Sequence, residues 1–217
     1  MNETQTTQNP LGFKSVPSLL RSFAIPSIIA TLVSSLYNIV DQVFIGQGVG
    51  YLGNSATNVS YPLTTICLAL SLLIGIGSAS RFSLCLGAGE QEKAEQVVGN
   101  SICMMLLSGI VYAVLIEIFL HPMLTAFGAT SENMAYAATY SRIIALGMPF
   151  QIVTTSMSSL IRADGSPKYS MTCMLIGAVL NTILDPIFIF VFNLGVAGAG
   201  WATMIGQFFS FLAAIAY

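Results

Sequence analysis

The chain of 217 residues carries only seven basic and nine acidic side chains, 7% of the total, whereas hydrophobic residues make up 55%. Soluble domains carry roughly 25% charged residues, so this composition excludes a soluble enzyme, which needs a charged surface. The net charge is −2. With no basic stripe in the sequence, nucleic-acid binding is excluded as well.

The few charges are clustered, and the gaps between the clusters are long. From residue 22 to residue 80 the only charge is Asp41, and from residue 169 to residue 217 it is Asp185. About 20 apolar residues suffice for one helix to cross a bilayer. Alternating ten-residue strands of a membrane barrel are absent. The sequence therefore predicts an all-α, polytopic membrane protein, a bundle of six transmembrane helices. The predicted spans are Pro17–Ile45, Ser55–Leu86, Val97–Leu120, Met134–Leu160, Tyr169–Phe192 and Ala197–Tyr217.

Turn residues separate the predicted spans. Ser131 is expected to cap the fourth helix with Glu132 in its first turn, and Pro167 suits the first turn of the fifth. A turn is also expected at His121-Pro122. The predicted joints are Gly46–Gly48, Gly87–Gly89, Phe127–Gly128, Asp164–Pro167 and Gly195–Gly200.

The basic residues predict the orientation. They fall before the first span and around the second and fourth joints, and the other joints have none, so the positive-inside rule places the N-terminus in the cytoplasm. We therefore expect a polar cytoplasmic segment (1–16) and a membrane lobe (17–217) in the plasma (inner) membrane. The apolar end at Tyr217 suggests a truncated lobe. The basic residues used for this prediction are Lys14, Arg21, Arg81, Lys93, Arg162 and Lys168; the seventh, Arg142, lies within the fourth span.

Some polar residues within the apolar stretches have an ordinary structural interpretation. The four cysteines show no CxxC spacing and are expected to be small buried residues. His121 is the only histidine, so a histidine metal site is not expected. Glu117 and Arg142 lie toward the outer ends of neighbouring spans, where an ion pair or snorkelling to the interface is the favoured interpretation.

Asp41 and Asp185 differ from these residues because neither has an obvious basic partner. At a rise of ~1.5 Å per residue they lie about 7 Å and about 10 Å from the outer ends of their helices, so both can face one cavity. Each has an asparagine one turn earlier on the same helix face. Hydrogen-bonded interhelical contact is one interpretation; ionisable groups without a counter-charge favour a functional one. The neighbouring polar residues are Tyr37, Asn38, Asn181 and Thr203.

Several short motifs, in this order, resemble the N-terminal lobe of the multidrug and toxic compound extrusion (MATE) transporters, prokaryotic branch. The resemblance covers nearly the whole chain. The matching segments are Ala24-Ile-Pro26, Tyr37-Asn38-x-x-Asp41-x-x-Phe-Ile-Gly46, Gly87-Ala-Gly89, Arg162-Ala-Asp-Gly165-x-Pro167-Lys168, Asn181-x-x-x-Asp185-Pro-x-Phe-Ile-Phe190 and Gly195-Val-Ala-Gly198-Ala-x-x-Ala-Thr203.

The resemblance implies one lobe of a two-lobed, twelve-helix transporter. Family members export drug-like, often cationic compounds by antiport against H⁺ or Na⁺, so no cofactor beyond the coupling ion is expected, and the lipid bilayer and a C-terminal lobe are the expected partners. It also implies that Asp41, Asn181, Asp185 and Thr203 form the cation site, an Na⁺ site if Na⁺ is the coupling ion, with Tyr37 beside it. Proline residues within the spans are typical of bent transporter helices; they are Pro26, Pro62, Pro149 and Pro186.

Substrate is expected to contact adaptable apolar and aromatic side chains, for which we name Tyr37, Phe150, Met157, Met174 and Met204. Three other functions compete with export. A lipid-linked precursor or polysaccharide flippase would need basic cavity residues, and only Arg142 is available. A non-transporting partner lobe is a second alternative. An intramembrane aspartyl protease is disfavoured because Asp185 lacks a Gly-x-Gly-Asp context.

Overall fold

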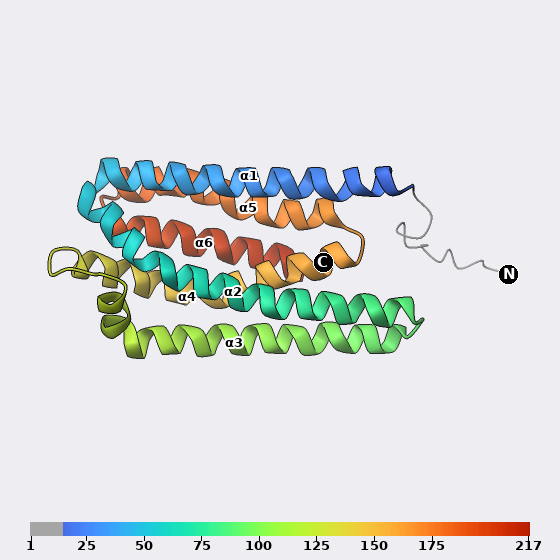
Figure 1. Ribbon diagram of the computed structural model, residues 1–217. Helices are drawn as coiled ribbons and strands as arrows, with labels where there is room; N and C mark the ends of the chain where they lie inside the picture. The colour runs from blue at the N-terminus through green and yellow to red at the C-terminus, as the bar shows by residue number, and fades with distance from the viewer. Residues whose placement is uncertain (1–14) are drawn as a thin grey trace.

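Six long helices run lengthwise along one axis in the computed structural model, which describes residues 15–217 (Figure 1). The all-α prediction is confirmed, and the described residues contain no strand. The predicted segment 1–16 lies almost entirely outside the described part of the chain. The helices are α1 (Val16–Gly48), α2 (Tyr51–Gly87), α3 (Gln91–Ala126), α4 (Met134–Ala163), α5 (Pro167–Pro186), continued by a π-helical segment (Ile187–Val191), and α6 (Gly195–Ile215).

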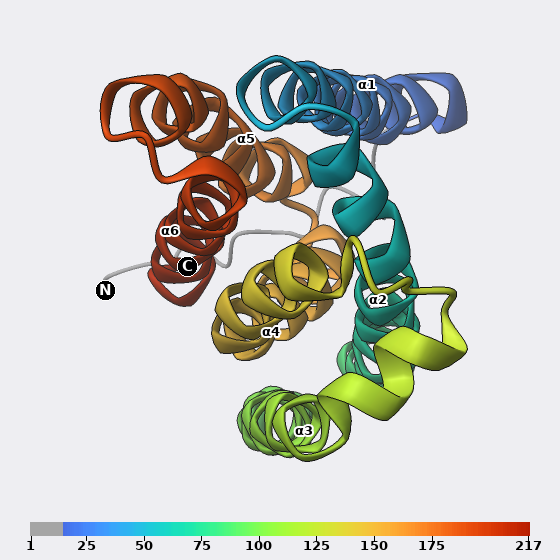
Figure 2. The same cartoon turned by 90° about the vertical axis from the view of Figure 1, so that its left-hand side faces the viewer.

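Helix α4 is the centre of the bundle and packs against α2, α3, α5 and α6 (Figure 2). Glycine residues on the neighbouring helices permit close packing. A Cβ atom on Gly75 of α2 would lie 2.7 Å from the Cα of Ser156, and one on Gly109 of α3 would lie 2.6 Å from the Cα of Pro149. Because the obstructing atoms are backbone atoms, these two contacts fix the distance of α2 and α3 from α4.

Helix α1 packs mainly along α5, which in turn packs on α6 (Figure 1). The remaining surface of α1 carries large exposed aliphatic side chains such as Leu32, Leu36 and Ile39. This arrangement leaves α1 at the edge of the bundle. On its other side α1 packs only sparsely against α2.

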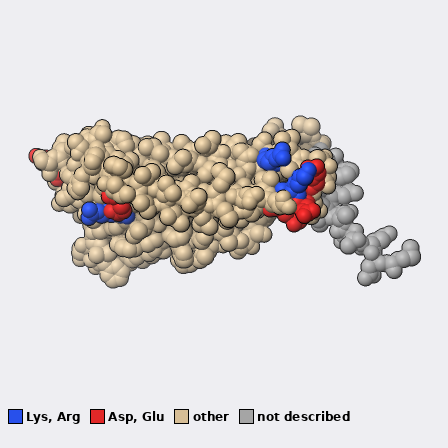
Figure 3. Space-filling view, turned by 90° about the horizontal axis from the view of Figure 1, so that it is seen from below, with Lys and Arg blue, Asp and Glu red and all other residues tan. Residues whose placement is uncertain are grey.

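The outer surface is that of a membrane protein. All six helices are long and apolar enough to span a bilayer. Charged side chains gather at the two ends of the long axis, and an uncharged band separates them (Figure 3). At one end the expected ion pair is present, with Arg142 Nε 3.6 Å from Glu117 Oε2 and both side chains about half exposed.

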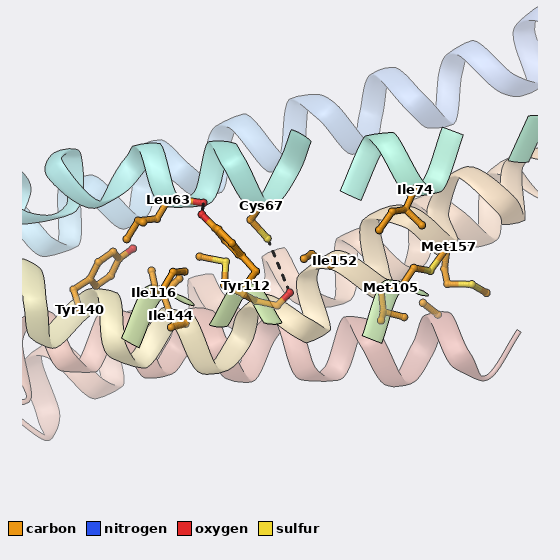
Figure 4. Packing of buried hydrophobic residues seen from close by; sticks show 14 of the residues in the cluster. Leu63, Cys67, Ile74, Met105, Tyr112, Ile116, Tyr140, Ile144, Ile152 and Met157 are labelled. Atoms are coloured by element: carbon orange, nitrogen blue, oxygen red, sulfur yellow. Dashed lines mark hydrogen bonds between the residues drawn. The ribbon is translucent and has the colours of Figure 1, made fainter. Parts of the chain in front are cut away.

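The hydrophobic core lies chiefly between α2, α3 and α4 (Figure 4). The hydroxyl of Tyr112 donates to the carbonyl of Leu63 at 2.7 Å, which satisfies the only polar atom of that buried side chain. The expectation for the cysteines is confirmed for the three that are buried, Cys67, Cys85 and Cys173, whereas Cys103 is exposed on α3.

Three predicted joints or turns lie inside helices. Helix α1 continues through Gly46–Gly48, and the chain turns at Gly50, whose φ is 84°. Helix α6 begins at Gly195, so the predicted joint Gly195–Gly200 forms its first turns. The turn expected at His121-Pro122 lies inside α3; the helix is instead kinked at Phe119 (φ −106°, ψ 17°), because a proline removes the hydrogen bond to the carbonyl four residues earlier and crowds it.

Helix α4 begins at Met134, as predicted, but its cap is not the expected one. Ser131 and Glu132 form a turn, and Asn133 directly precedes the helix. The side chain of Asn133 accepts from the Thr130 amide at 2.8 Å and donates to Ser55 of α2 at 2.7 Å. These two bonds hold the connection before α4 against α2. Pro167 stands in the first turn of α5, as predicted.

Candidate functional site

A cavity of about 360 Å³ opens between α1, α2, α4, α5 and α6. The helices that surround it are seen end-on in Figure 2. It contains polar side chains from all five helices, including Tyr37 and Asp41 of α1 and Asn181 of α5. A cavity lined by polar groups within an apolar bundle is where a transported solute or ion finds hydrogen-bonding partners.

The structure brings Asp41 and Asp185 together. Asp41 is 6% exposed and Asp185 is 0% exposed, and the packing of α1 along α5 places the two carboxyl groups near each other. Pro186 follows Asp185 directly, and the helix widens into the π-helical segment beyond it. Such π segments are frequent at functional sites.

Asn181 and Thr203 complete this group. In the amide orientation that satisfies both neighbours, Asn181 donates to Asp185 Oδ2 at 3.1 Å and accepts from the Thr203 hydroxyl at 3.2 Å. The two residues come from α5 and α6, and Asn181 is buried. A chain of hydrogen bonds therefore connects α6 to one of the two carboxyl groups.

Tyr37 and Asn38 both line the cavity one turn before Asp41. The amide of Asn38 donates to the Ser34 carbonyl of its own helix at 2.6 Å. Neither side chain forms a hydrogen bond to Asp41 or Asp185, but Tyr37 lines the same cavity as Asp41.

Electrostatically, the carboxyl pair lacks an internal counter-charge. Among residues 15–217, none of the side chains that line the cavity is Lys, Arg or His. The Oδ1 atom of Asp41 is buried without a hydrogen-bond partner. Burying two negative charges at low dielectric is costly unless a cation accompanies them.

The donor set has a definite chemical character. Carboxylate, amide and hydroxyl oxygens are hard ligands that suit H⁺ or a hard cation such as Na⁺. The described residues contain no cluster of three or more His, Cys, Asp or Glu side chains of the kind that holds a transition metal. The unpartnered oxygen of Asp41 is the atom at which such a cation would fit.

The five side chains expected at the substrate are dispersed. Tyr37 and Met174 line the cavity. Phe150 packs against Phe208 and Phe211, with ring centroids 5.2 Å away in both cases. Met157 lies in the packed core near Ile74 and Met105 (Figure 4), and Met204 lies beside Gly147.

Other cavity residues escaped the sequence analysis. Tyr140 of α4 is buried at the cavity wall, and Gln42, Thr57, Gln151 and Gln207 contribute amides and a hydroxyl. The Thr57 hydroxyl donates to Gln42 Oε1 at 3.1 Å, which joins α2 to α1. The glutamines within the predicted spans could have indicated this polar wall from the sequence, because an amide is costly in lipid unless it faces a cavity or a partner.

Comparisons with known proteins agree with this geometry. The sequence model of the MatE family matches residues 26–187. The multidrug export protein MepA of Staphylococcus aureus (strain MSSA476) is 33% identical over 195 residues, which cover 90% of this chain and 43% of MepA. The probable multidrug resistance protein YoeA of Bacillus subtilis (strain 168) is 29% identical, over 98% of this chain and 48% of YoeA.

Solved structures give the same result. The MATE multidrug transporter DinF-BH superposes with a TM-score of 0.86 at 38% identity, over 90% of this chain and 44% of that one. An outward-facing multidrug resistance MATE family transporter of the MOP superfamily gives a TM-score of 0.85 at 26% identity, over 90% and 43%. The chain spans about half the length of the relatives it matches.

Proposed function

The chain belongs to the multidrug and toxic compound extrusion family, and from that premise we propose that it is the cation-binding lobe of a secondary multidrug exporter. It would exchange H⁺ or Na⁺ for drug-like organic cations, as a transporter and not an enzyme. The observation that carries this proposal is the buried pair Asp41 and Asp185. Asp41 lines a cavity whose lining residues, within the described part of the chain, include no basic side chain, and Asp185 lies fully buried beside it.

Coupling follows from the charge of this pair. With the site empty, two ionised carboxylates repel each other in a low-dielectric setting. Entry of H⁺ or Na⁺ removes the repulsion, so α1 can pack differently along α5. Pro26 lies buried within α1, where a missing backbone hydrogen bond makes bending easier. If the cation and the substrate favour different arrangements of α1, the gradient of one drives the other.

A second six-helix lobe is part of the proposal. The relatives are about twice as long as this chain. Transporters of repeated architecture bind their substrates at the interface of two halves and rock one half against the other. We assign the cation site to this lobe and the opposite wall of the transport path to a C-terminal lobe.

The proposed location is the plasma (inner) membrane, with the N-terminus in the cytoplasm. Apart from Arg142, which is paired with Glu117, the basic residues of the described part lie at the end of the bundle where α1 begins and the α2–α3 and α4–α5 connections lie (Figures 1 and 3). Such an asymmetry is typical of the cytoplasmic side. The carboxyl pair then lies in the outer half of the membrane.

The flippase alternative receives no support from the cavity. A lipid-linked pyrophosphate needs cationic partners, and Arg142, the one basic residue considered for this role, is paired with Glu117 at the end of the bundle instead of facing the cavity.

Transport by the complete two-lobed protein, reconstituted in proteoliposomes, tests the proposal. We expect ethidium to be transported against an imposed H⁺ or Na⁺ gradient, and Asp41→Asn to abolish this transport per folded molecule. Glu117→Gln is the matched control, because it also converts a carboxyl to an amide but lies outside the cavity, and it should transport normally. Normal transport by Asp41→Asn would make the aspartate pair structural.

A further inference from the structure

We propose that a groove between the start of α1 and the start of α5 binds the headgroup of an anionic phospholipid. The groove lies at the basic end of the bundle, and its lining shares no residue with the cavity that contains Asp41. The proposal goes beyond the proposed function and does not depend on it, because a lipid site at the membrane boundary needs no transported compound.

The groove is formed by two helices and a connection. Its volume is about 510 Å³, and small-molecule sites usually have volumes of about 300 to 1,000 Å³. One wall is the first two turns of α1, including Leu19 and Phe23. The other wall is the α4–α5 connection with the first two turns of α5, including Lys168 and Thr172. The groove is therefore large enough for a headgroup and the beginning of its acyl chains.

Polarity changes along the groove in the same direction as along a phospholipid. Lys168 is exposed in the first turn of α5, at the end of the bundle. Phe23 is half-buried and lies one turn farther along α1 than Leu19, toward the middle of the membrane. A phosphate at the end of the bundle would lie near the ammonium group of Lys168, and the glycerol would lie against apolar side chains.

The segments around the groove carry an excess of positive charge. Lys168 lines the groove, Arg21 lies in the α1 turn that forms one wall, and Arg162 lies in the last turn of α4, before the connection. None of these three forms an ion pair within residues 15–217. Asp164 of the connection is the acidic residue of these segments, and it accepts a hydrogen bond from the Tyr217 hydroxyl. Three positive charges against one negative charge favour an anion.

The hydroxyl groups of the groove do not supply the donors that a phosphate needs. The Ser22 hydroxyl donates to the carbonyl of Leu19 at 2.8 Å, and the Thr172 hydroxyl donates to the carbonyl of Lys168 at 3.0 Å. Because both hydrogens are directed at the helix backbone, binding of an anion depends mainly on charge. Lys168, the basic residue that lines the groove, is therefore the residue whose loss should weaken binding most.

The position of the groove favours a phospholipid as the occupant. The groove lies where the basic end of the bundle meets the uncharged band (Figure 3). From there α1 continues with exposed aliphatic side chains such as Ile25 and Ile28, along which acyl chains can lie. Basic pockets between transmembrane helices on the cytoplasmic side bind anionic headgroups, and the cytoplasmic leaflet is rich in such lipids.

Two lipids with the same acyl chains test the charge selection. Native mass spectrometry of the delipidated two-lobed protein should give a Kd for dioleoylphosphatidylglycerol that is lower than that for dioleoylphosphatidylcholine by roughly fivefold or more. Lys168→Gln should raise the Kd of the anionic lipid by roughly fivefold. Lys93→Gln is the matched control, because Lys93 is paired with Glu90 at 2.7 Å and lies outside the groove. It should leave both Kd values unchanged.

A variant that fills the groove tests its location without changing the charge. Thr172→Phe adds a large side chain to an exposed residue of the groove wall, and it should raise the Kd of dioleoylphosphatidylglycerol several-fold. Thr139→Phe is the control, since Thr139 is also exposed on a helix but lies outside the groove. It should have no effect.

Three results would overturn the proposal. The first is an equal Kd for the two lipids in the wild-type protein. The second is an effect of Lys168→Gln or of Thr172→Phe no larger than that of its control. The third is displacement of the lipid by inorganic phosphate more effectively than by sodium chloride at equal ionic strength, because it would identify a site for a free anion instead of a lipid headgroup.

Discussion

Asp41 of α1 and Asp185 of α5 face each other, but their carboxyl groups are held unequally. Asp185 is completely buried and accepts a hydrogen bond from Asn181, whereas Oδ1 of Asp41 is buried without a partner. An unsatisfied buried polar atom costs about 1 to 3 kcal/mol. Asp41 is therefore the member of the pair that contributes least to the stability of this state and is best placed to exchange a cation.

This inequality predicts different stabilities for two similar variants. Asp185→Asn should lower the free energy of unfolding by about 1 to 3 kcal/mol, because it disturbs a buried hydrogen bond to Asn181. Asp41→Asn should lower it by less than Asp185→Asn does, since Oδ1 of Asp41 accepts no hydrogen bond that could be lost. Both should lose gradient-driven efflux, because each leaves at most one carboxyl. Thermal melting in detergent measures the first quantity. Equal losses of stability would contradict the unequal roles.

Asn181→Ala should slow transport without abolishing it. The change removes hydrogen bonds to Asp185 and Thr203, about 1 kcal/mol each, but keeps both carboxyl groups. The initial rate of gradient-driven efflux per folded molecule should fall several-fold and stay above that of Asp41→Asn. A rate as low as that of Asp41→Asn, in protein that is normally folded, would mean that the amide itself is essential to cation binding.

The fold and the carboxyl pair were predictable for physical reasons. A bilayer tolerates few polar residues, so six long uncharged stretches define six helices, and a lone aspartate inside each of two stretches is a strong signal. The fixed rise of a helix then gives their depth. Asp41 and Asp185 lie near each other between α1 and α5, as that calculation suggests.

The remainder of the cavity depends on packing that no single helix encodes. Tyr140 and Gln151 line it because α4 stands at the centre of the bundle. Phe150, the immediate neighbour of Gln151, packs on α6 instead. Residue type indicates that a side chain is adaptable, but the helix face it occupies becomes known only once the neighbouring helices are placed.

The orientation predicts which loops react from outside. In a cysteine-free background, Thr130→Cys before α4 should be labelled in intact cells by an impermeant maleimide, and Lys168→Cys at the start of α5 should be labelled only after permeabilisation. Both side chains are exposed, so accessibility within the protein is not the difference. The reverse labelling pattern would invert the topology and place the carboxyl pair in the inner half of the membrane.

The close contact between α2 and α4 gives a prediction with an internal control two residues away. A Cβ atom on Gly75 would lie 2.7 Å from the Cα of Ser156, whereas one on Gly77 meets no atom within 4 Å. Gly75→Ala must therefore push the two helices apart, which costs about 1 to 3 kcal/mol through overpacking. It also disturbs the bond from the Ser156 hydroxyl to the Ser71 carbonyl, 2.8 Å long. Gly77→Ala should be neutral or stabilising by up to about 1 kcal/mol, because alanine is the better helix former. Melting temperatures in the same detergent compare the two variants, and a Gly75→Ala protein as stable as Gly77→Ala would show that α2 does not depend on this contact with α4.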